Sequence, residues 1–462
     1  MYNLSIMYLK GMICIFPVEK NKEYTVKIDA ISSEGSGIAR IDGYTVFVPH
    51  AVTGDTARIL IVKTKSSYGY GKLLEVITPS DIRANPPCPH YLKCGGCQLM
   101  PVEYSAQLEI KRNFVRDAMH RIGSIETESD IIGSDEPLRY RNKMIFPFDS
   151  EKRWGFYRTH SHDVIPLSDC LLGNELNAKI MDTVSQYMHR YNVSAYDEKK
   201  HTGIIRRVFI RSSHDAFMVV ISANTSSLPH SDELIASLRS VSDKISGIIL
   251  NVNKKRTNLV LGDKNITLWG KDTLSAVLCG HNYKISPHSF FQINPVQTEK
   301  LYNTAIKFAE ISPSDTVMDI YCGIGTISLT AAKYAKKVIG IEIVPEAIEN
   351  AIENAKENNI ANAEFYCSAA EDIVPDMIKN GEKPDIVILD PPRKGSDTDT
   401  LSAIVSAEPK RIVYVSCNPA TLARDAKYLS ENGYHVEKTT AVDMFPYTAH
   451  VETVVLLQRQ NT

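Results

Sequence analysis

The stretch "DTVMDIYCGIGTISLTAAKYA", residues 315–335, decides the fold class of this chain. An apolar run leads into Gly323-x-Gly325 and then into a helical pattern, which predicts a strand, a tight turn and a helix. The next segment, residues 337–359, has the pattern of a strand and a long charged helix. Three more apolar strands are predicted within residues 384–390, 411–417 and 454–458. Such near-continuous apolar strands are typical of a parallel sheet buried on both faces, so residues 286–462 are predicted to form a doubly wound, Rossmann-like α/β domain.

Polar side chains follow the strands of this predicted sheet at their carboxyl ends, where open α/β sheets bind ligands. These side chains are Asp319, Glu342, Asp390 and Cys417. The glycine turn lets a ligand approach the backbone closely, because no Cβ stands in the way. Glu342 lies about twenty residues after the turn, where an acid accepts ribose hydroxyl groups. Together these features predict an adenosine-type cofactor, either a dinucleotide or S-adenosylmethionine (SAM).

The segment "LDPPRKG", residues 389–395, favours SAM. Two prolines stiffen the backbone directly after Asp390 and aim its carboxylate into the crevice. Dinucleotide folds have no need of this element, whereas SAM-dependent nucleic-acid methyltransferases often carry an acidic or amide Pro-Pro segment after the fourth strand. In amino-group methyltransferases a tyrosine usually follows the prolines, but here Arg393 follows them.

Cys417 in "VSCNPATLARD", residues 415–425, is a candidate nucleophile. Free cysteine is among the most buried residue types, so a core thiol is the alternative. A thiolate at a strand end suits one reaction in particular. Carbon 5 of uracil is a poor nucleophile, and attack by a thiolate at carbon 6 creates an enolate that accepts a methyl group at carbon 5.

That reaction also needs a base to remove the hydrogen on carbon 5 so that the thiol is expelled. Glu452, with His450 nearby, is the candidate in "DMFPYTAHVETVV", residues 443–455. Taken alone, Glu452 has the pattern of an exposed loop acid, and this alternative stays open.

The amino-terminal part of the chain predicts two further domains after an extension at residues 1–20. Short alternating runs predict a small antiparallel, OB-like β-barrel within residues 21–79. Residues 80–285 mix helical and β-like runs, which predict an α+β central domain; a helix at 101–122 is expected to pack on the catalytic domain. A basic and aromatic cluster in the barrel is typical of RNA binding. The alternative is a solvated strand edge whose lysines prevent aggregation. The cluster comprises Lys63, Lys65, Tyr68, Tyr70 and Lys72.

A second candidate RNA contact is "RYRNKMIFPF", residues 139–148, which places Arg139, Arg141 and Lys143 around an aromatic-rich strand. These cations suit phosphate contacts, with plain surface charge as the alternative.

The composition is that of a soluble globular protein: 462 residues, 43% hydrophobic and 23% charged. A net charge of −2 excludes a uniformly basic nucleic-acid coat, so a partner must be inferred from local sites. No apolar run of about 18 residues occurs, so no membrane span is expected. Nine cysteines are too few for a secreted disulfide scaffold, which favours a cytoplasmic protein.

Six motifs, in order and at characteristic spacings, resemble those of the RNA uracil-5 methyltransferases. They are "FFQIN" (290–294), "DIYCGIGT" (319–326), "GIEIV" (340–344), "ILDPPRKG" (388–395), "VSCNPATLARD" and "DMFPYTAHVE". The segment "CPHYLKCGGCQLMPVEYSAQLEIKR", residues 88–112, is similar to the iron–sulfur segment of the 23S ribosomal RNA branch, and the barrel is similar to that branch's TRAM domain.

The resemblance implies SAM-dependent methylation of carbon 5 of a single-stranded or loop uridine in 23S ribosomal RNA, by a monomer. Cys417 is then the nucleophile and Glu452 the base. The implied pocket for SAM and the uracil comprises Gln292, Tyr321, Glu342 and Asp390. The implied ligands of a [4Fe-4S] cluster are Cys88, Cys94, Cys97 and Cys170; four thiolates alone are equally suited to zinc.

Three alternatives remain open at this stage. A transfer RNA uridine-5 methyltransferase commonly lacks the barrel and the cysteine segment, and cytosine-5 enzymes usually place their cysteines in other motifs. A non-catalytic iron–sulfur RNA-binding protein would need none of Cys417, Glu452 and Asp390.

Overall fold

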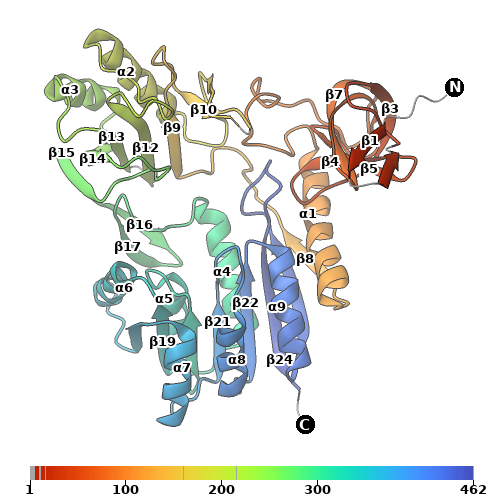
Figure 1. Cartoon of the computed structure of the whole chain (residues 1–462). Helices are drawn as coiled ribbons and strands as arrows, with labels where there is room; N and C mark the ends of the chain where they lie inside the picture. The colour runs from red at the N-terminus through yellow and green to blue at the C-terminus, as the bar shows by residue number, and fades with distance from the viewer. Residues whose placement is uncertain (1–5, 10–11, 16, 160, 215, 461–462) are drawn as a thin grey trace. The chain divides into compact units, whose positions relative to one another are not determined.

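The computed structural model describes residues 6–9, 12–15, 17–159, 161–214 and 216–460 (Figure 1). The chain divides into two compact units, which are described separately. The first comprises Met1–Phe114 and Phe445–His450, and the second comprises Val115–Met444 and Val451–Thr462.

A closed barrel forms the core of the first unit. Its strand order is β3-β4-β5-β7-β6, with bounds Glu23–Ile31, Ser36–Ile41, Tyr44–Pro49, Tyr68–Thr78 and Thr56–Thr64. Alternate residues point inward and are fully buried, among them Ile28, Val46 and Ile59, because the strands have a period of two. The predicted barrel is therefore confirmed. Of the predicted extension, β1 (Ile6–Leu9) and β2 (Met12–Ile15) form a hairpin, while residues 1–5, 10–11 and 16 lie outside the described residues.

The helix expected at 101–122 forms as α1 (Tyr104–Ala118) followed by a π-helical turn, Met119–Gly123. The turn ends at Ser124, which adopts a left-handed conformation. Val115 and Met119 are buried in the same apolar cluster as Leu422 and Ala423. The end of this helix thus packs against helix α9 (Pro419–Glu431) of the catalytic sheet.

The central part of the second unit contains a five-stranded sheet of order β15-β14-β13-β12-β9. The bounds of these strands are Lys264–Gly270, Ile245–Val252, Ala216–Ala223, Ile205–Ser213 and Lys143–Pro147. Helices α2 (Leu176–Arg190) and α3 (Ser231–Val241) contribute Ile180, Leu234 and Leu238 to its core. Two hairpins flank this part: β10 (Gly155–Tyr157) with β11 (Val164–Pro166), and β16 (Leu274–Leu278) with β17 (His281–Ile285).

An eight-stranded sheet of order β20-β19-β18-β21-β22-β24-β23-β8 carries the candidate site. The bounds of these strands are Ala363–Cys367, Lys337–Glu342, Thr316–Ile320, Ile386–Leu389, Arg411–Ser416, Glu452–Arg459, Tyr434–Val442 and Ser129–Ile132. The first five strands are parallel, and β24 is antiparallel to both of its neighbours. The predicted Rossmann-like fold is confirmed, and the sheet brings the carboxyl ends of β18, β19, β21 and β22 to one edge.

Six helices cover the two faces of this sheet. Helices α7, α8 and α9 contribute to one apolar cluster with Met318, Ile320 and Tyr414. Helices α4, α5 and α6 pack on the opposite face, where Asp319 of β18 meets Ser328 of α5. The bounds of α4 to α9 are Pro295–Ala309, Thr326–Ala332, Pro345–Glu357, Ala370–Lys379, Thr398–Ala407 and Pro419–Glu431.

The edge strand β8 lies in a segment that the sequence placed in the central domain. It pairs in parallel with β23, and Ser129 lies opposite Thr439 in that pairing. Four residues, "SDII", are too short to show a period. Across the described ranges, no helix has the length and hydropathy of a transmembrane segment.

Candidate active site

The glycine turn after β18 opens one side of the site. Tyr321, Gly323 and Gly325 all have positive φ, at 67°, 55° and 83°, so the chain reverses sharply before α5. A Cβ at Gly323 would meet no atom within 4 Å, which leaves room for a ligand beside the backbone. The Gly323 amide donates to Glu342 across 3.2 Å.

Glu342 is fixed at the end of β19 by its own backbone. One carboxylate oxygen accepts hydrogen bonds from the amides of Ile343 and Val344, at 2.8 and 3.0 Å. The other accepts from Gly323. Carboxylate oxygens retain further lone pairs, so this group is preorganised to accept hydroxyl groups from a ligand in the turn. Ile343 beside it is 66% exposed, an apolar surface at the same strand end.

Two aspartates on adjacent strands have raised pKa values. Burial raises the pKa of Asp319 to about 7, with a hydrogen bond from Ser328 opposing and the nearby Asp390 adding to the rise. Burial likewise raises the pKa of Asp390 to about 7. Asp390 follows directly on β21, and its amide donates to the Ile320 carbonyl at 3.4 Å. The strand end therefore holds carboxyl groups in a low-dielectric setting, where perturbed pKa values are typical of functional sites.

Cys417 and Glu452 are brought together by strand pairing. In the antiparallel pairing of β22 with β24, Ser416 lies opposite Thr453. The next residue outward on each strand is Cys417 on one side and Glu452 on the other. Glu452 is the first residue of β24 and is only 4% exposed, so the alternative of an exposed loop acid is wrong.

Both groups have pKa values raised above their usual range. Burial, then Glu452 and Asp390, raise the pKa of Cys417 to about 11, while Arg393 lowers it. Burial and Asp390 raise the pKa of Glu452 to about 8, with Arg393 again opposing. Asp390 thus raises the pKa of both groups, and Arg393 lowers both. Cys417 is only partly buried, so it remains accessible to a reactant.

The proline loop after Asp390 is held in place by the helix that follows Cys417. Asn418 and Thr421 donate to the Arg393 carbonyl, at 3.0 and 3.3 Å. Asp425, which is 1% exposed, accepts from the Ser396 amide at 2.9 Å and from a tyrosine hydroxyl on β22. No role was predicted from the sequence for Arg393 or Asp425. Their only sequence signal was their place in "ILDPPRKG" and "VSCNPATLARD".

Tyr321 borders the site beside the proline loop, whereas the contact that the structure shows for Gln292 is with the segment "RYRNK". The Tyr321 hydroxyl is 3.0 Å from the Ser396 hydroxyl in the proline loop. Gln292 is partly buried, and its carbonyl accepts a hydrogen bond from the Asn142 side chain at 2.9 Å. The amide of Asn142 donates to Ile293, so the segment "FFQIN" is tied to "RYRNK".

The cations of "RYRNK" have different environments. Arg139 pairs with Asp169 at 2.6 Å and donates to the carbonyls of Cys170 and Gly173, a structural arrangement. Burial and the positive charges of Arg211 and Arg141 lower the pKa of Lys143 to about 8. Plain surface charge does not describe either residue.

The four cysteines predicted to hold a cluster lie in both units: Cys88, Cys94 and Cys97 in the first and Cys170 in the second. All four are partly buried. Among the residues that the structure describes, no three His, Cys, Asp or Glu side chains are grouped so that they could hold a metal ion. The described residues thus show no site for the predicted cluster.

Comparison with known proteins identifies the family. The model of the tRNA (uracil-5-)-methyltransferase family matches residues 103–460, and the model of the TRAM domain matches residues 17–74. An uncharacterized RNA methyltransferase of Clostridium tetani is 44% identical over 447 residues, covering 96% of this chain and 97% of the relative. A similar protein of Clostridium acetobutylicum is 44% identical over 454 residues, covering 96% and 99%.

One solved structure is similar over almost the whole chain. It is the tRNA (uracil-54, C5)-methyltransferase of Pyrococcus abyssi in complex with S-adenosyl-L-homocysteine. The TM-score is 0.76 at 26% identity, and the match covers 94% of this chain and 99% of the other. S-adenosyl-L-homocysteine is the product that SAM leaves after methyl transfer, which agrees with the cofactor predicted for the glycine turn. The chain belongs to the tRNA (uracil-5-)-methyltransferase family and is a SAM-dependent RNA methyltransferase with an amino-terminal TRAM barrel.

Proposed function

We propose that this enzyme methylates carbon 5 of a uridine in 23S ribosomal RNA, with Cys417 as nucleophile and Glu452 as base. The observation that carries the mechanism is the meeting of a half-buried thiol and a buried carboxyl group at the paired ends of β22 and β24. Uracil C5 methylation needs one group of each kind, on one substrate and away from bulk water. The barrel and the cysteine segment at residues 88–97 favour the ribosomal RNA branch.

Cys417 attacks carbon 6 of the uracil as a thiolate. In the ligand-free protein its pKa is raised to about 11, so at neutral pH the sulfur holds its proton and releases it to solvent before it attacks, which its partial exposure allows. Arg393 is the nearby positive charge that favours the thiolate. When bound, SAM supplies the methyl group as a sulfonium electrophile.

Glu452 completes the reaction by removing a proton. After methyl transfer, carbon 5 carries both the new methyl group and its original hydrogen. The Glu452 carboxylate takes this hydrogen as a proton, the C5–C6 double bond forms again, and the bond from carbon 6 to the Cys417 sulfur breaks. A base with a pKa of about 8 is well matched to this step near neutral pH.

We assign Gln292, Tyr321, Glu342 and Asp390 to the pocket for SAM and the uracil. These groups fit an adenosine-type cofactor. The Glu342 carboxylate is a fixed hydrogen-bond acceptor, and there is open space beside the Gly323 backbone. Asp390 lies next to both reacting side chains, so it is placed to bind a polar edge at the reacting centre.

Mapping of 5-methyluridine by mass spectrometry tests the substrate. RNA from a strain that lacks the gene is expected to lose 5-methyluridine at one or more positions of 23S ribosomal RNA, and purified enzyme with SAM is expected to restore it. The Pyrococcus abyssi neighbour acts on transfer RNA, which makes transfer RNA the second candidate substrate. Loss confined to transfer RNA would support that candidate, and no loss in either RNA would contradict the proposed function.

The [4Fe-4S] cluster remains a prediction from the cysteine pattern. Protein purified without oxygen is expected to be brown and to contain about four iron atoms per chain. Replacing Cys94 by Ser is expected to remove most of the iron, whereas Cys367→Ser, at an exposed thiol outside the pattern, leaves it unchanged. A colourless, zinc-loaded protein would contradict the prediction.

A further inference from the structure

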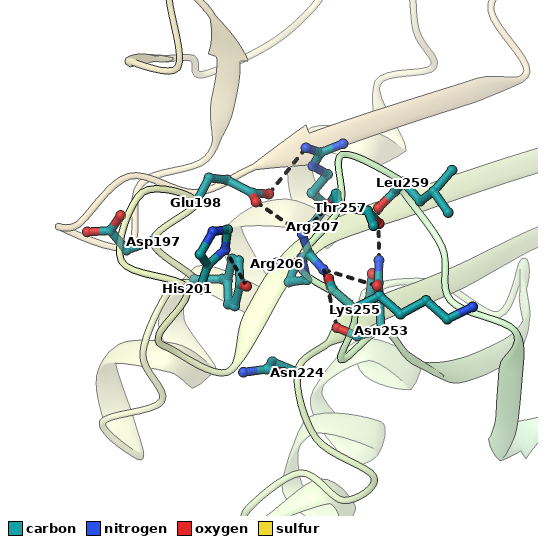
Figure 2. Close-up of polar contacts among 12 residues, drawn as sticks. Asp197, Glu198, His201, Arg206, Arg207, Asn224, Asn253, Lys255, Thr257 and Leu259 are labelled. Atoms are coloured by element: carbon teal, nitrogen blue, oxygen red, sulfur yellow. Dashed lines mark hydrogen bonds and ion pairs between the residues drawn. The ribbon is translucent and has the colours of Figure 1, made fainter.

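Two basic loops lie at one end of the five-stranded central sheet, outside the catalytic site. They are residues 197–201, "DEKKH", shortly before β12, and residues 253–259, "NKKRTNL", directly after β14 (Figure 2). We call them the basic loops. Their exposed cations are Lys199, Lys200, Lys254, Lys255 and Arg256.

The second loop is held from inside by Arg206, whose side chain is 1% exposed. One Arg206 terminal nitrogen donates to the Asn253 side-chain oxygen at 3.0 Å and to the Lys255 carbonyl at 2.7 Å. The other donates to the Thr257 carbonyl at 2.8 Å. A single guanidinium group therefore fixes the backbone of the loop at alternate residues, as Figure 2 shows.

Glu198 joins the two loops through the same guanidinium group. Its carboxylate accepts from Arg206 at 3.0 Å and from Arg207 at 3.3 Å. The Arg206 guanidinium also lies 4.4 Å from the centre of the Tyr196 ring. The first loop is fixed in turn by Asp197, whose side chain accepts from the amides of Lys199 and Lys200.

The chain therefore places a buried arginine and a largely buried glutamate beneath two loops whose lysines and Arg256 are exposed. Desolvating an ion pair costs several kcal/mol, and its attraction repays this only with good geometry. A loop that only connects two strands does not need to be held rigid in this way. Rigid presentation lowers the entropy lost when the cations meet a partner, which is the usual reason for such preorganisation.

The exposed charge of the basic loops is positive. Within the described ranges, Lys254 and Arg256 take part in no ion pair, while Lys255 pairs with the exposed Asp263 and Lys200 lies 3.8 Å from Asp197. Five cations ordered on two adjacent loops match the repeated negative charge of a nucleic-acid backbone.

We propose that the basic loops bind RNA phosphates away from the reacting nucleotide and that Arg206 and Glu198 are their positioning residues. This inference rests on the proposed function in that the bound RNA is the substrate. The contact adds affinity without reading the base sequence, since it addresses only the backbone.

Charge reversal in the loop tests the proposal. The variant Lys254→Glu with Arg256→Glu is compared with Lys179→Glu and Lys271→Glu, two exposed lysines elsewhere in the central part. Binding of full-length protein to poly(U) is measured across salt concentrations. The loop variant is expected to bind ~10-fold more weakly and to lose about 1 to 1.5 from the slope of log affinity against log salt, and the control pair is expected to lose less than half of this.

Kinetics on the 23S ribosomal RNA transcript give a second measurement. The loop variant is expected to raise KM several-fold and to leave kcat unchanged, because the loops do not touch the reacting atoms. Binding and KM equal to those of the control pair would overturn the proposal. If the wild-type enzyme methylates no RNA, the proposed function is wrong. The salt dependence of poly(U) binding would still show whether the basic loops bind RNA.

A variant of Arg206 tests the ordering of the second basic loop separately from its positive charge. Arg206→Lys keeps every exposed cation but loses the planar fork that reaches three loop groups. It is expected to weaken poly(U) binding several-fold and to speed trypsin cleavage after Lys254, Lys255 or Arg256, with thermal unfolding of the chain measured in parallel. Unchanged cleavage and unchanged affinity would contradict the positioning role. If this variant does not fold, the charge reversal alone decides.

Discussion

Replacing Cys417 by Ala is expected to abolish methyl transfer to RNA and the covalent complex with 5-fluorouridine RNA. The thiol supplies the bond to carbon 6 that activates carbon 5, and no other group at the β22–β24 end can form it. The rate of transfer of the SAM methyl group is expected to fall on the order of 10⁴-fold or more. Binding of SAM, measured by calorimetry, is expected to stay nearly intact.

Cys279→Ala is the matched control for this variant. Cys279 is also a partly buried thiol with a pKa raised by burial, but it lies at the turn between β16 and β17. Its loss is expected to leave methyl transfer close to the wild-type rate. Methylation of RNA by Cys417→Ala would contradict the assignment of Cys417 as the nucleophile.

The fold could be predicted from the sequence where a short stretch of residues shows the hydrophobic pattern of a strand or a helix. The barrel strands alternate residue by residue, and the strands that end at Ile320, Glu342 and Leu389 are apolar runs between helices. Both patterns are visible within about ten residues, the range over which periodicity is reliable. The strand β8 was missed because its four residues carry no period and its partner β23 is about three hundred residues away.

The sequence predicts members for the candidate site, but it does not predict their environment. Motif positions identified Cys417 and Glu452, yet Glu452 alone had the pattern of an exposed loop acid. Its burial arises from the pairing of β24 with β22 and β23, which no local window contains. Asp425 was missed for the same reason, since its contact with Ser396 joins helix α9 to the proline loop.

Replacing Glu452 by Gln is expected to stop the reaction one step later than Cys417→Ala does. Attack and methyl transfer do not need the carboxylate, but removal of the carbon-5 proton does. The enzyme is therefore expected to accumulate a methylated covalent RNA adduct that survives denaturing electrophoresis, while turnover falls ~10²-fold or more. Glu437→Gln, at an exposed acid on β23, is the control and should turn over normally.

The pH dependence of Glu452→Gln distinguishes a role of Glu452 as the base from a purely structural role. In the wild type the pKa of Glu452 is raised to about 8, so kcat is expected to rise with pH as the carboxylate ionises through that value, and this limb should be missing from the residual turnover of the variant. An ionised Glu452 also raises the pKa of Cys417, so the neutral glutamine should lower it. Alkylation of Cys417 by iodoacetamide near pH 9 should then be faster in Glu452→Gln than in the wild type. Normal turnover with unchanged alkylation would assign the proton to another base and leave Glu452 as a buried structural acid.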